Sequence, residues 1–162
     1  MINDLTVRLF EHNNWANARI IDVCCALSDE QLNAEPPSAV KGNIRTTLTH
    51  FVTAQRSYLS ALTLPPEKSP ITQLTLNDLK ESARKSGEGL LALVKGEQEP
   101  LQNLTHIRDD FKVEPWMIMV QVLQHAAEHR EQIKSMLTAL GITPPDIDGW
   151  DFGSEISSLV SK

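Results

Sequence analysis

Two histidines stand four residues apart in the C-terminal third of the chain, at His125 and His129. On an α-helix, residues at positions i and i+4 lie about 5–6 Å apart on the same face, so both imidazoles can reach one ion. Imidazole nitrogen is a common ligand of zinc and of other divalent transition metals. The spacing therefore predicts that His125 and His129 are two ligands of a divalent metal site.

A third ligand is needed, because two imidazoles alone bind a metal weakly. The other histidines are His12, His50 and His106. His12 falls on the apolar face of a predicted helix, and His106 lies in an irregular segment where we expect an exposed side chain. We favour His50, because its neighbours on a helix are small enough to leave room for an ion and its water: Thr46, Thr47, Ala54, Ser57 and Ala61.

The segment from His125 to His129 also reads H-x-x-E-H, the pattern of the inverted zinc peptidases, in which Glu128 would be the general base. Such an enzyme needs a further acidic ligand and a substrate cleft, and this chain is small for a protease. Glu128 is about 100° around the helix from His129, so its default place is the solvated surface. We therefore rank the peptidase interpretation below a simple metal site.

These histidines must be positioned by helices, because apolar residues recur at helical spacing over about 3–27, 43–62, 76–94 and 115–140. Pro115 suits a first helical turn, and Gly141 suits the end of the last helix. Gly87 and Gly89 weaken the third helix. We expect one side of the first helix to be buried: Leu5, Leu9, His12, Ala16, Ile20, Val23 and Leu27.

The last predicted helix is expected to point its histidines inward, in a stripe made of Val122, His125, His129, Ile133 and Met136. Residues 101–113 are β-compatible and fit either a short hairpin or a crossover loop. In the tail that follows, Trp150 and Phe152 are expected to fold back on the helices. The pattern as a whole predicts an all-α, single-domain protein over residues 1–162, a four-helix bundle with one long, irregular connection between helices 3 and 4.

Composition narrows the possible partners. The chain has 162 residues and a formal net charge of -6, without the clusters of Lys and Arg that nucleic acids or anionic membranes attract. No apolar run approaches the roughly 20 residues of a membrane span, and Asp4, Arg8 and Glu11 interrupt any signal-like start, so we expect a cytoplasmic protein. Cys24 and Cys25 are adjacent, which disfavours a disulfide between them, and we interpret them as reduced, apolar filler.

The residues described above also carry a resemblance to a known family. The sequence resembles the DinB family of bacterial four-helix-bundle proteins over nearly its whole length. The similar segments are Leu9 to Asn17 (LFEHNNWAN), the run from Ile44 that ends in Leu48-Thr49-His50-Phe51, Gln124 to Arg130 (QHAAEHR) and Leu140 to Asp146 (LGITPPD). Their order and spacing together make the resemblance fairly specific.

The resemblance implies a metal site made of one histidine from the second helix and an H-x-x-x-H pair from the fourth, which correspond to His50, His125 and His129. It further implies zinc or nickel as the metal, a homodimer, and, as in some related members, activation of a low-molecular-weight thiol such as bacillithiol or mycothiol. His12 has no counterpart in that ligand set, and we consider it either as a residue that contacts a ligand of the metal or as an additional ligand.

Three functional hypotheses follow. The first is a metal-dependent S-transferase that passes a small-molecule thiol to an electrophile in detoxification or stress response. The second is a hydrolase using metal-bound hydroxide, which needs a base near the open position, for which His12 and Glu11 are the candidates. The third is a non-catalytic, stress-related binding bundle whose metal is structural or absent.

Overall fold

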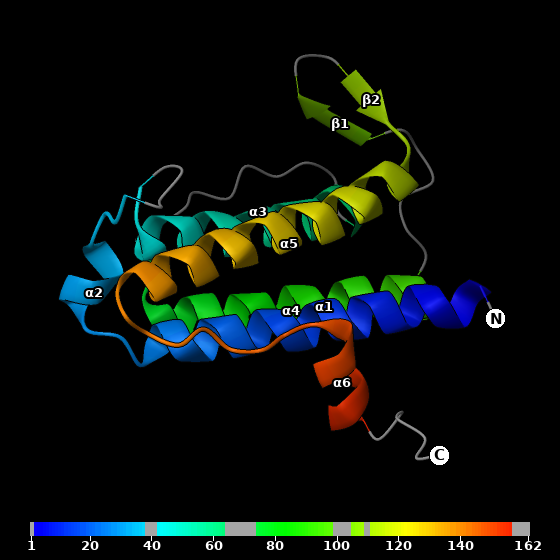
Figure 1. Ribbon diagram of the computed structural model, residues 1–162. Helices are drawn as coiled ribbons and strands as arrows, with labels where there is room; N and C mark the ends of the chain where they lie inside the picture. Colours follow the sequence, from blue (N-terminus) through cyan, green and yellow to red (C-terminus); the bar gives the residue numbers. More distant parts are fainter. Residues whose placement is uncertain (1, 38–41, 64–73, 99–104, 109–110, 157–162) are drawn as a thin grey trace, which may run out of the picture.

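The computed structural model describes residues 2–37, 42–63, 74–98, 105–108 and 111–156. Four long helices make up most of this part of the chain: α1 (Ile2–Cys25), α3 (Ile44–Thr63), α4 (Leu76–Lys95) and α5 (Pro115–Ala139) (Figure 1). They coincide with the four predicted helices to within about two residues at each end, the uncertainty usual for helix boundaries. The all-α class is therefore confirmed.

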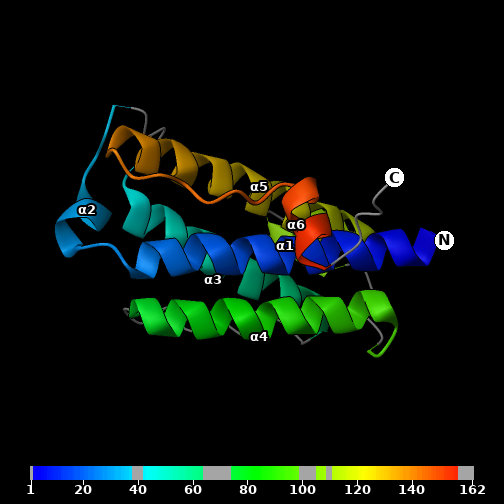
Figure 2. The ribbon, with the colours of Figure 1, turned by 60° about the horizontal axis from the view of Figure 1, so that its bottom comes forward.

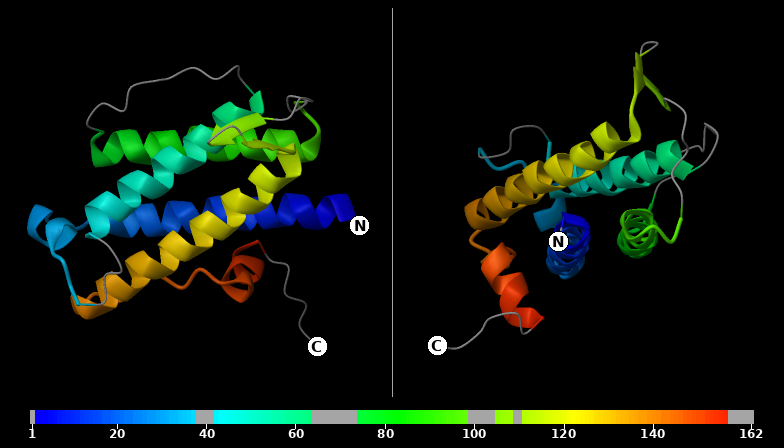
Figure 3. Two further views of the ribbon diagram at one scale, coloured as in Figure 1. Left: turned by 90° about the horizontal axis from the view of Figure 1, so that it is seen from above. Right: turned by 90° about the vertical axis from the view of Figure 1, so that its right-hand side faces the viewer.

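The four long helices form two layers. α1 packs along α4 in one layer and α3 packs along α5 in the other, and the second pair crosses the first obliquely (Figures 1 and 3). Each pair is antiparallel, whereas α3 and α4 run in the same direction (Figure 2). The end of α3 and the start of α4 consequently lie at opposite ends of the bundle, which the sequence did not indicate.

The predicted irregular connection between α4 and α5 contains an antiparallel hairpin. Its strands are β1 (Thr105–Arg108) and β2 (Phe111–Val113), with a register irregularity between His106 and Arg108. Of the two alternatives left open for this segment, the hairpin is the one observed. The hairpin lies next to the first turn of α5, at the end of the bundle where that helix begins (Figure 1).

Two short helices were not predicted, α2 (Asp29–Asn33) and α6 (Gly149–Glu155). Each begins with a capping box, in which the side chain of Ser28 or Asp148 accepts a backbone N–H of the first turn. These caps satisfy donors that a helix otherwise leaves unpaired. Ser28 and Asp29, which follow the end of α1, thus start a second helix.

The ends of the long helices follow local chemistry. Thr75 and Asp78 form a capping box at the start of α4, and Gly96 ends it with a φ of 72°. Pro115 occupies the first turn of α5, as predicted. Gly141, at φ 73°, follows that helix, and the Ile142 N–H donates to the Leu137 carbonyl at 2.9 Å. This left-handed C-terminal cap is the one expected from the sequence.

Gly87 and Gly89 lie inside α4 because neighbouring helices approach it closely. A Cβ atom on Gly87 would lie 2.6 Å from Oδ1 of Asn14 on α1, and one on Gly89 would lie 2.6 Å from Cδ2 of Leu59 on α3. The Asn14 amide also donates to the Gly87 carbonyl at 2.9 Å. The glycines that weakened the prediction therefore serve interhelical packing.

The buried side of α1 differs from the predicted one. Leu5 and Leu9 are 63% and 45% exposed, so their expected burial is wrong. The buried positions include two asparagines, which a hydrophobicity pattern does not select: Phe10, Asn13, Ala16, Asn17, Ile20, Ile21 and Cys24. Asn13 and Asn17 are tolerated there because both accept hydrogen bonds from Arg130, as described below.

The C-terminal segment folds back in part. The Phe152 ring packs against Trp15 and His12 with both ring centroids 5.5 Å away, as expected from the sequence. Trp150 is 77% exposed, so its expected burial is wrong. In the described residues, no helix is both long enough and apolar enough to cross a bilayer.

Candidate metal centre

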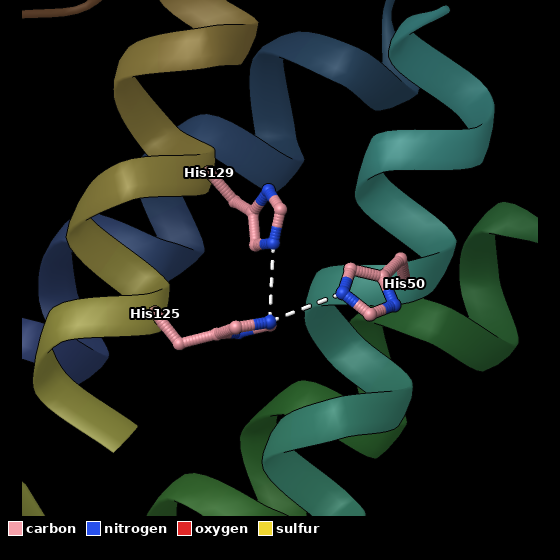
Figure 4. Close-up of side chains that lie close together, drawn as sticks. All are labelled: His50, His125 and His129. Atoms are coloured by element: carbon pink, nitrogen blue, oxygen red, sulfur yellow. Dashed lines mark hydrogen bonds between the residues drawn. The ribbon is translucent and has the colours of Figure 1, made fainter. Parts of the chain in front are cut away.

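The structure brings three histidines together between two neighbouring helices. His50 comes from the middle of α3, and His125 and His129 come from successive turns of α5. Figure 4 shows the three rings turned toward one another from the two facing helices. One ligand-type nitrogen from each lies within 4.8 Å of the others. Ring centroids 4.3–5.0 Å apart show how closely the imidazoles approach.

The distances between the ring nitrogens suit a shared ion. Nε2 of His125 lies 3.1 Å from Nε2 of His50 and 3.1 Å from Nε2 of His129. Two nitrogens bound to one zinc at about 2.0–2.1 Å are about 3.3 Å apart in tetrahedral geometry and about 2.9 Å apart in octahedral geometry. The observed separations fall between these values, so a small shift of the side chains would accommodate either geometry.

Hydrogen bonding alone does not satisfy this arrangement. A neutral imidazole carries a single N–H and a single lone pair on different nitrogens, so each Nε2 offers one proton or one lone pair. Nε2 of His125 faces two nitrogens at 3.1 Å and can form a good hydrogen bond with one of them. A cation at the centre accepts a lone pair from every ring, and the donor set therefore fits a metal.

Gln132 orients His129. Nδ1 of His129 lies 2.7 Å from Oε1 of Gln132, and because a carbonyl oxygen only accepts, Nδ1 carries the proton and donates it. In the neutral ring, Nε2 is then left with its lone pair pointing toward the other two histidines. A polar partner of this kind is the usual device by which proteins fix the tautomer of a metal-binding histidine.

The central ring, His125, is electrically neutral at physiological pH. Burial first, and then the neighbouring His129 and His50, lower its pKa from 6.5 to about 4. Tyr58 packs edge-on against the same ring, with centroids 5.8 Å apart, and contributes to this burial. Because imidazole must be deprotonated to bind a metal, the depressed pKa keeps His125 ready to bind at neutral pH.

The histidines lie on the edge of the core rather than inside it. His50 is exposed, and His125 and His129 are half-buried. Of the stripe expected to point inward, Val122, Ile133 and Met136 are buried, but the histidines stand beside them on the flank that faces α3. Ala126 and Arg130 are the buried positions next to the two histidines on α5. Because His50 is exposed and the other two rings are half-buried, the site is accessible to solvent.

The remaining candidates from the sequence lie elsewhere or are committed to other contacts. His12 joins α1 to the C-terminal segment, with Nε2 2.9 Å from the carbonyl oxygen of Ile147. Glu11 pairs with Arg8 at 2.7 Å. His106 lies in β1, and its side chain falls outside the described residues. Glu128 is exposed, as expected for a surface carboxylate and not for a buried general base.

Both cysteines are free thiols, in agreement with the sequence interpretation. Cys24 is fully buried in the core, and burial raises its pKa to about 12. Burial also raises the pKa of the half-buried Cys25 thiol. At neutral pH both are protonated, so neither has the thiolate character that a reactive cysteine requires.

Sequence reasoning missed two residues close to the histidine pair. Gln132 is three positions after His129, on the same face of the helix, and that spacing was a usable signal. Arg130 is 7% exposed, and burial lowers the pKa of its guanidinium to about 10, so it stays charged in the interior at neutral pH. The sequence gave no sign that Arg130 is buried, because arginine is usually exposed unless it has partners in the interior.

Fold and site together define a helical-bundle protein with a surface-accessible cluster of three histidines that could hold a metal ion. The sequence profile of the DinB family matches residues 1–156. The chain therefore belongs to the DinB family. No curated protein matches the chain significantly.

Proposed function

We propose that His50, His125 and His129 bind a divalent metal, zinc or nickel, and that the protein uses it to activate a low-molecular-weight thiol for transfer to an electrophile. The observation that carries the proposal is the convergence of three imidazole nitrogens at one point. Three protein ligands and an exposed side are typical of catalytic sites, whereas structural zinc sites are closed by four.

The chemistry that a bound metal supplies is a lowered pKa for a thiol in its open coordination position. A free thiol has a pKa of about 8.5, so a modest decrease makes thiolate the dominant form at neutral pH. The thiolate sulfur then forms a bond to an electrophilic carbon, the bond from that carbon to its leaving group breaks, and the thiol proton passes to solvent. His125 is neutral at neutral pH, so no proton has to leave its ring before the metal binds.

This reaction is a better fit than hydrolysis. Hydrolysis needs a base beside the open position, and the two residues considered for that role have other partners: Glu11 pairs with Arg8, and His12 contacts Ile147 and Phe152. A thiol is acidic enough to react without such a base. The accessibility of His50 also supports a site that admits a small molecule.

The test begins with elemental analysis of protein purified without added metal. Metal-loaded protein is then assayed for conjugation of bacillithiol, mycothiol, glutathione or cysteine to 1-chloro-2,4-dinitrobenzene, beside a screen of ester and amide substrates. We expect about one divalent metal per chain and metal-dependent conjugation that His50→Ala, His125→Ala and His129→Ala each abolish.

Glu128→Gln is the matched control, because Glu128 is exposed and lies between the two histidines of α5. We expect it to leave metal content and conjugation unchanged, whereas a peptidase of the H-x-x-E-H type would lose its activity. Protein that carries no metal, or whose metal affects melting but no reaction, would contradict the proposal and favour a non-catalytic bundle.

A further inference from the structure

A buried hydrogen-bond network links all four long helices through Arg130. Nη1 of Arg130 on α5 donates to Oδ1 of Asn13 at 2.8 Å and to Oδ1 of Asn17 at 2.6 Å, both on α1. Nδ2 of Asn17 donates to Oε1 of Gln55 on α3 at 2.9 Å. Nε2 of Gln55 donates to Oγ of Ser86 on α4 at 2.8 Å. One continuous chain of hydrogen bonds thus crosses the interior of the bundle.

This network is costly for stability. A guanidinium 7% exposed gives up most of its hydration, and the partners recorded for it here are neutral amides. Nδ2 of Asn13, in a residue 1% exposed, has no hydrogen-bond partner within the described part of the chain. Apolar side chains at positions 13, 17 and 130 together would avoid these costs, so the network calls for an explanation other than maximal stability.

Hydrophobic burial defines the rotation of α5 only coarsely. Near its start the helix exposes Trp116, Met117 and Val120, at 60%, 46% and 50% of their surface, while Ile118 and Val122 are buried. Apolar side chains therefore lie on both faces of this segment. Further along the helix, Ile133, Met136 and Leu137 determine which face is buried, but apolar packing tolerates a rotation of a few degrees, and a directional polar contact limits that freedom.

The rotation of α5 decides whether the histidines meet. Side-chain ends lie about 5–6 Å from a helix axis, so a rotation of about 10° moves them by about 1 Å. Metal sites tolerate about 0.2 Å in ligand distance. Arg130 follows His129 directly, about 100° around the helix. The network also reaches Gln55, five residues after His50 on α3, and so connects both helices that carry the histidines.

We propose that Arg130 is a positioning residue for the histidine site: its hydrogen bonds to Asn13 and Asn17 set the rotation of α5 and hold His125 and His129 against His50. This inference rests on the proposed metal binding. It assigns the arginine an effect on the metal that is separate from any effect on folding, and the two are measured separately.

Arg130→Met is the main test, because methionine fills much of the buried volume and makes no directional hydrogen bond. The substitution also leaves Oδ1 of Asn13 and of Asn17 without their donor, which lowers stability, so it is compared with a variant that is destabilised in another way. We expect Arg130→Met to keep its helical circular dichroism, to melt at a lower temperature, to bind Co²⁺ and Zn²⁺ about 10–100-fold more weakly in chelator competition, and to shift the visible bands of bound Co²⁺. Arg130→Lys, which keeps a cationic donor, should lie between Met and wild type.

Ile133→Ala is the matched control. Ile133 is fully buried on the same helix, and its truncation creates a cavity without removing any hydrogen bond of the network. We expect it to lower the melting temperature while changing metal affinity by less than about threefold and leaving the Co²⁺ bands in place. Wild-type affinity in folded Arg130→Met, or an affinity loss in Ile133→Ala as large as in Arg130→Met, would overturn the positioning role.

Two further measurements keep the outcome interpretable. If Arg130→Met does not fold, Asn13→Ala removes one acceptor and leaves Asn17 in place, and we expect about a three- to tenfold loss of metal affinity. If the wild-type protein binds no metal, the proposed function fails, and the inference is tested in metal-free protein by ¹⁵N NMR of the histidine rings. The ring signals of His125 and His129 should move in Arg130→Met and not in Ile133→Ala; unchanged signals would refute the inference.

Discussion

Two polar clusters lie within one turn of each other on α5, and they differ in burial and in how their hydrogen-bond donors and acceptors are paired. Around Arg130, every recorded hydrogen bond joins a donor to an acceptor, and the cluster is closed inside the bundle. Around His125, three ring nitrogens face one another at the edge of the bundle, and one of them has two partners for a single hydrogen bond. Apart from Nδ2 of Asn13, the first cluster pairs its donors and acceptors within the protein, whereas the second could hold a cation.

This difference teaches how to separate a structural cluster from a binding site. Counting donors and acceptors is more informative than burial, because the more buried cluster is the one whose polar groups are paired, apart from Nδ2 of Asn13. Both clusters draw on α3 and α5. A histidine substitution should act mainly on the metal, whereas a substitution in the network should act on folding and, where it frees the rotation of α5, on the metal as well.

Removing the central imidazole should give the largest change. We expect His125→Ala to reduce metal affinity by about 1,000-fold, which is about 4 kcal/mol, because one of three ligands is lost. The metal-free fold should keep its stability to within about 1 kcal/mol, because the ring that is removed is only half-buried. Chelator competition and urea unfolding measure the two quantities. A large loss of stability in the metal-free protein would erase the contrast between the clusters.

The opposite result is expected on the other side of the comparison. Gln55→Leu removes the acceptor of Asn17 and the donor to Ser86, which leaves buried polar groups without partners. We expect the free energy of unfolding to fall by about 3 kcal/mol. Ser57→Ala, an exposed change on the same helix, should cost less than about 0.5 kcal/mol. Equal unfolding midpoints in urea for the two variants would mean that the network contributes little.

A smaller effect should follow loss of the orienting amide. Gln132→Leu removes the acceptor of the His129 Nδ1–H and should weaken metal binding about 10–100-fold without changing the number of ligands. Gln124→Leu is the same substitution at an exposed position of α5 and should leave affinity unchanged. If both variants bound zinc like wild type, the tautomer of His129 would have to be set by another contact.

The smallest effect concerns pH. The pKa of His125 is about 4 in the folded protein, against 6.5 for the free side chain, so the unfolded state binds more protons between these values. The stability of metal-free protein should therefore decrease as pH falls from about 6.5 to about 4, by about 1 kcal/mol after allowance for solvent screening of a half-exposed ring. The difference between wild type and His125→Gln in urea unfolding isolates this contribution from that of the carboxylates. Parallel pH profiles would show that the ring titrates normally.

The long helices were predictable because their signals are local. Apolar periodicity, Pro115 at a first turn and Gly141 at a last one act within a few residues. The short helices α2 and α6 were missed, because five or seven residues carry too little periodicity, although Ser28 and Asp148 are recognisable caps. The homodimer, the thiol substrate and the identity of the metal remain predictions.

The sequence by itself determined the helices and the four-residue spacing of His125 and His129, because both depend on the geometry of a single helix. Only the tertiary structure decided that His50 meets this pair, that Leu5 and Leu9 face solvent, and that Arg130 is buried beside the site. These outcomes depend on how helices rotate and pack against one another. No local pattern contains that information, because the hydrogen bonds that select the rotation join residues as far apart as Asn13 and Arg130.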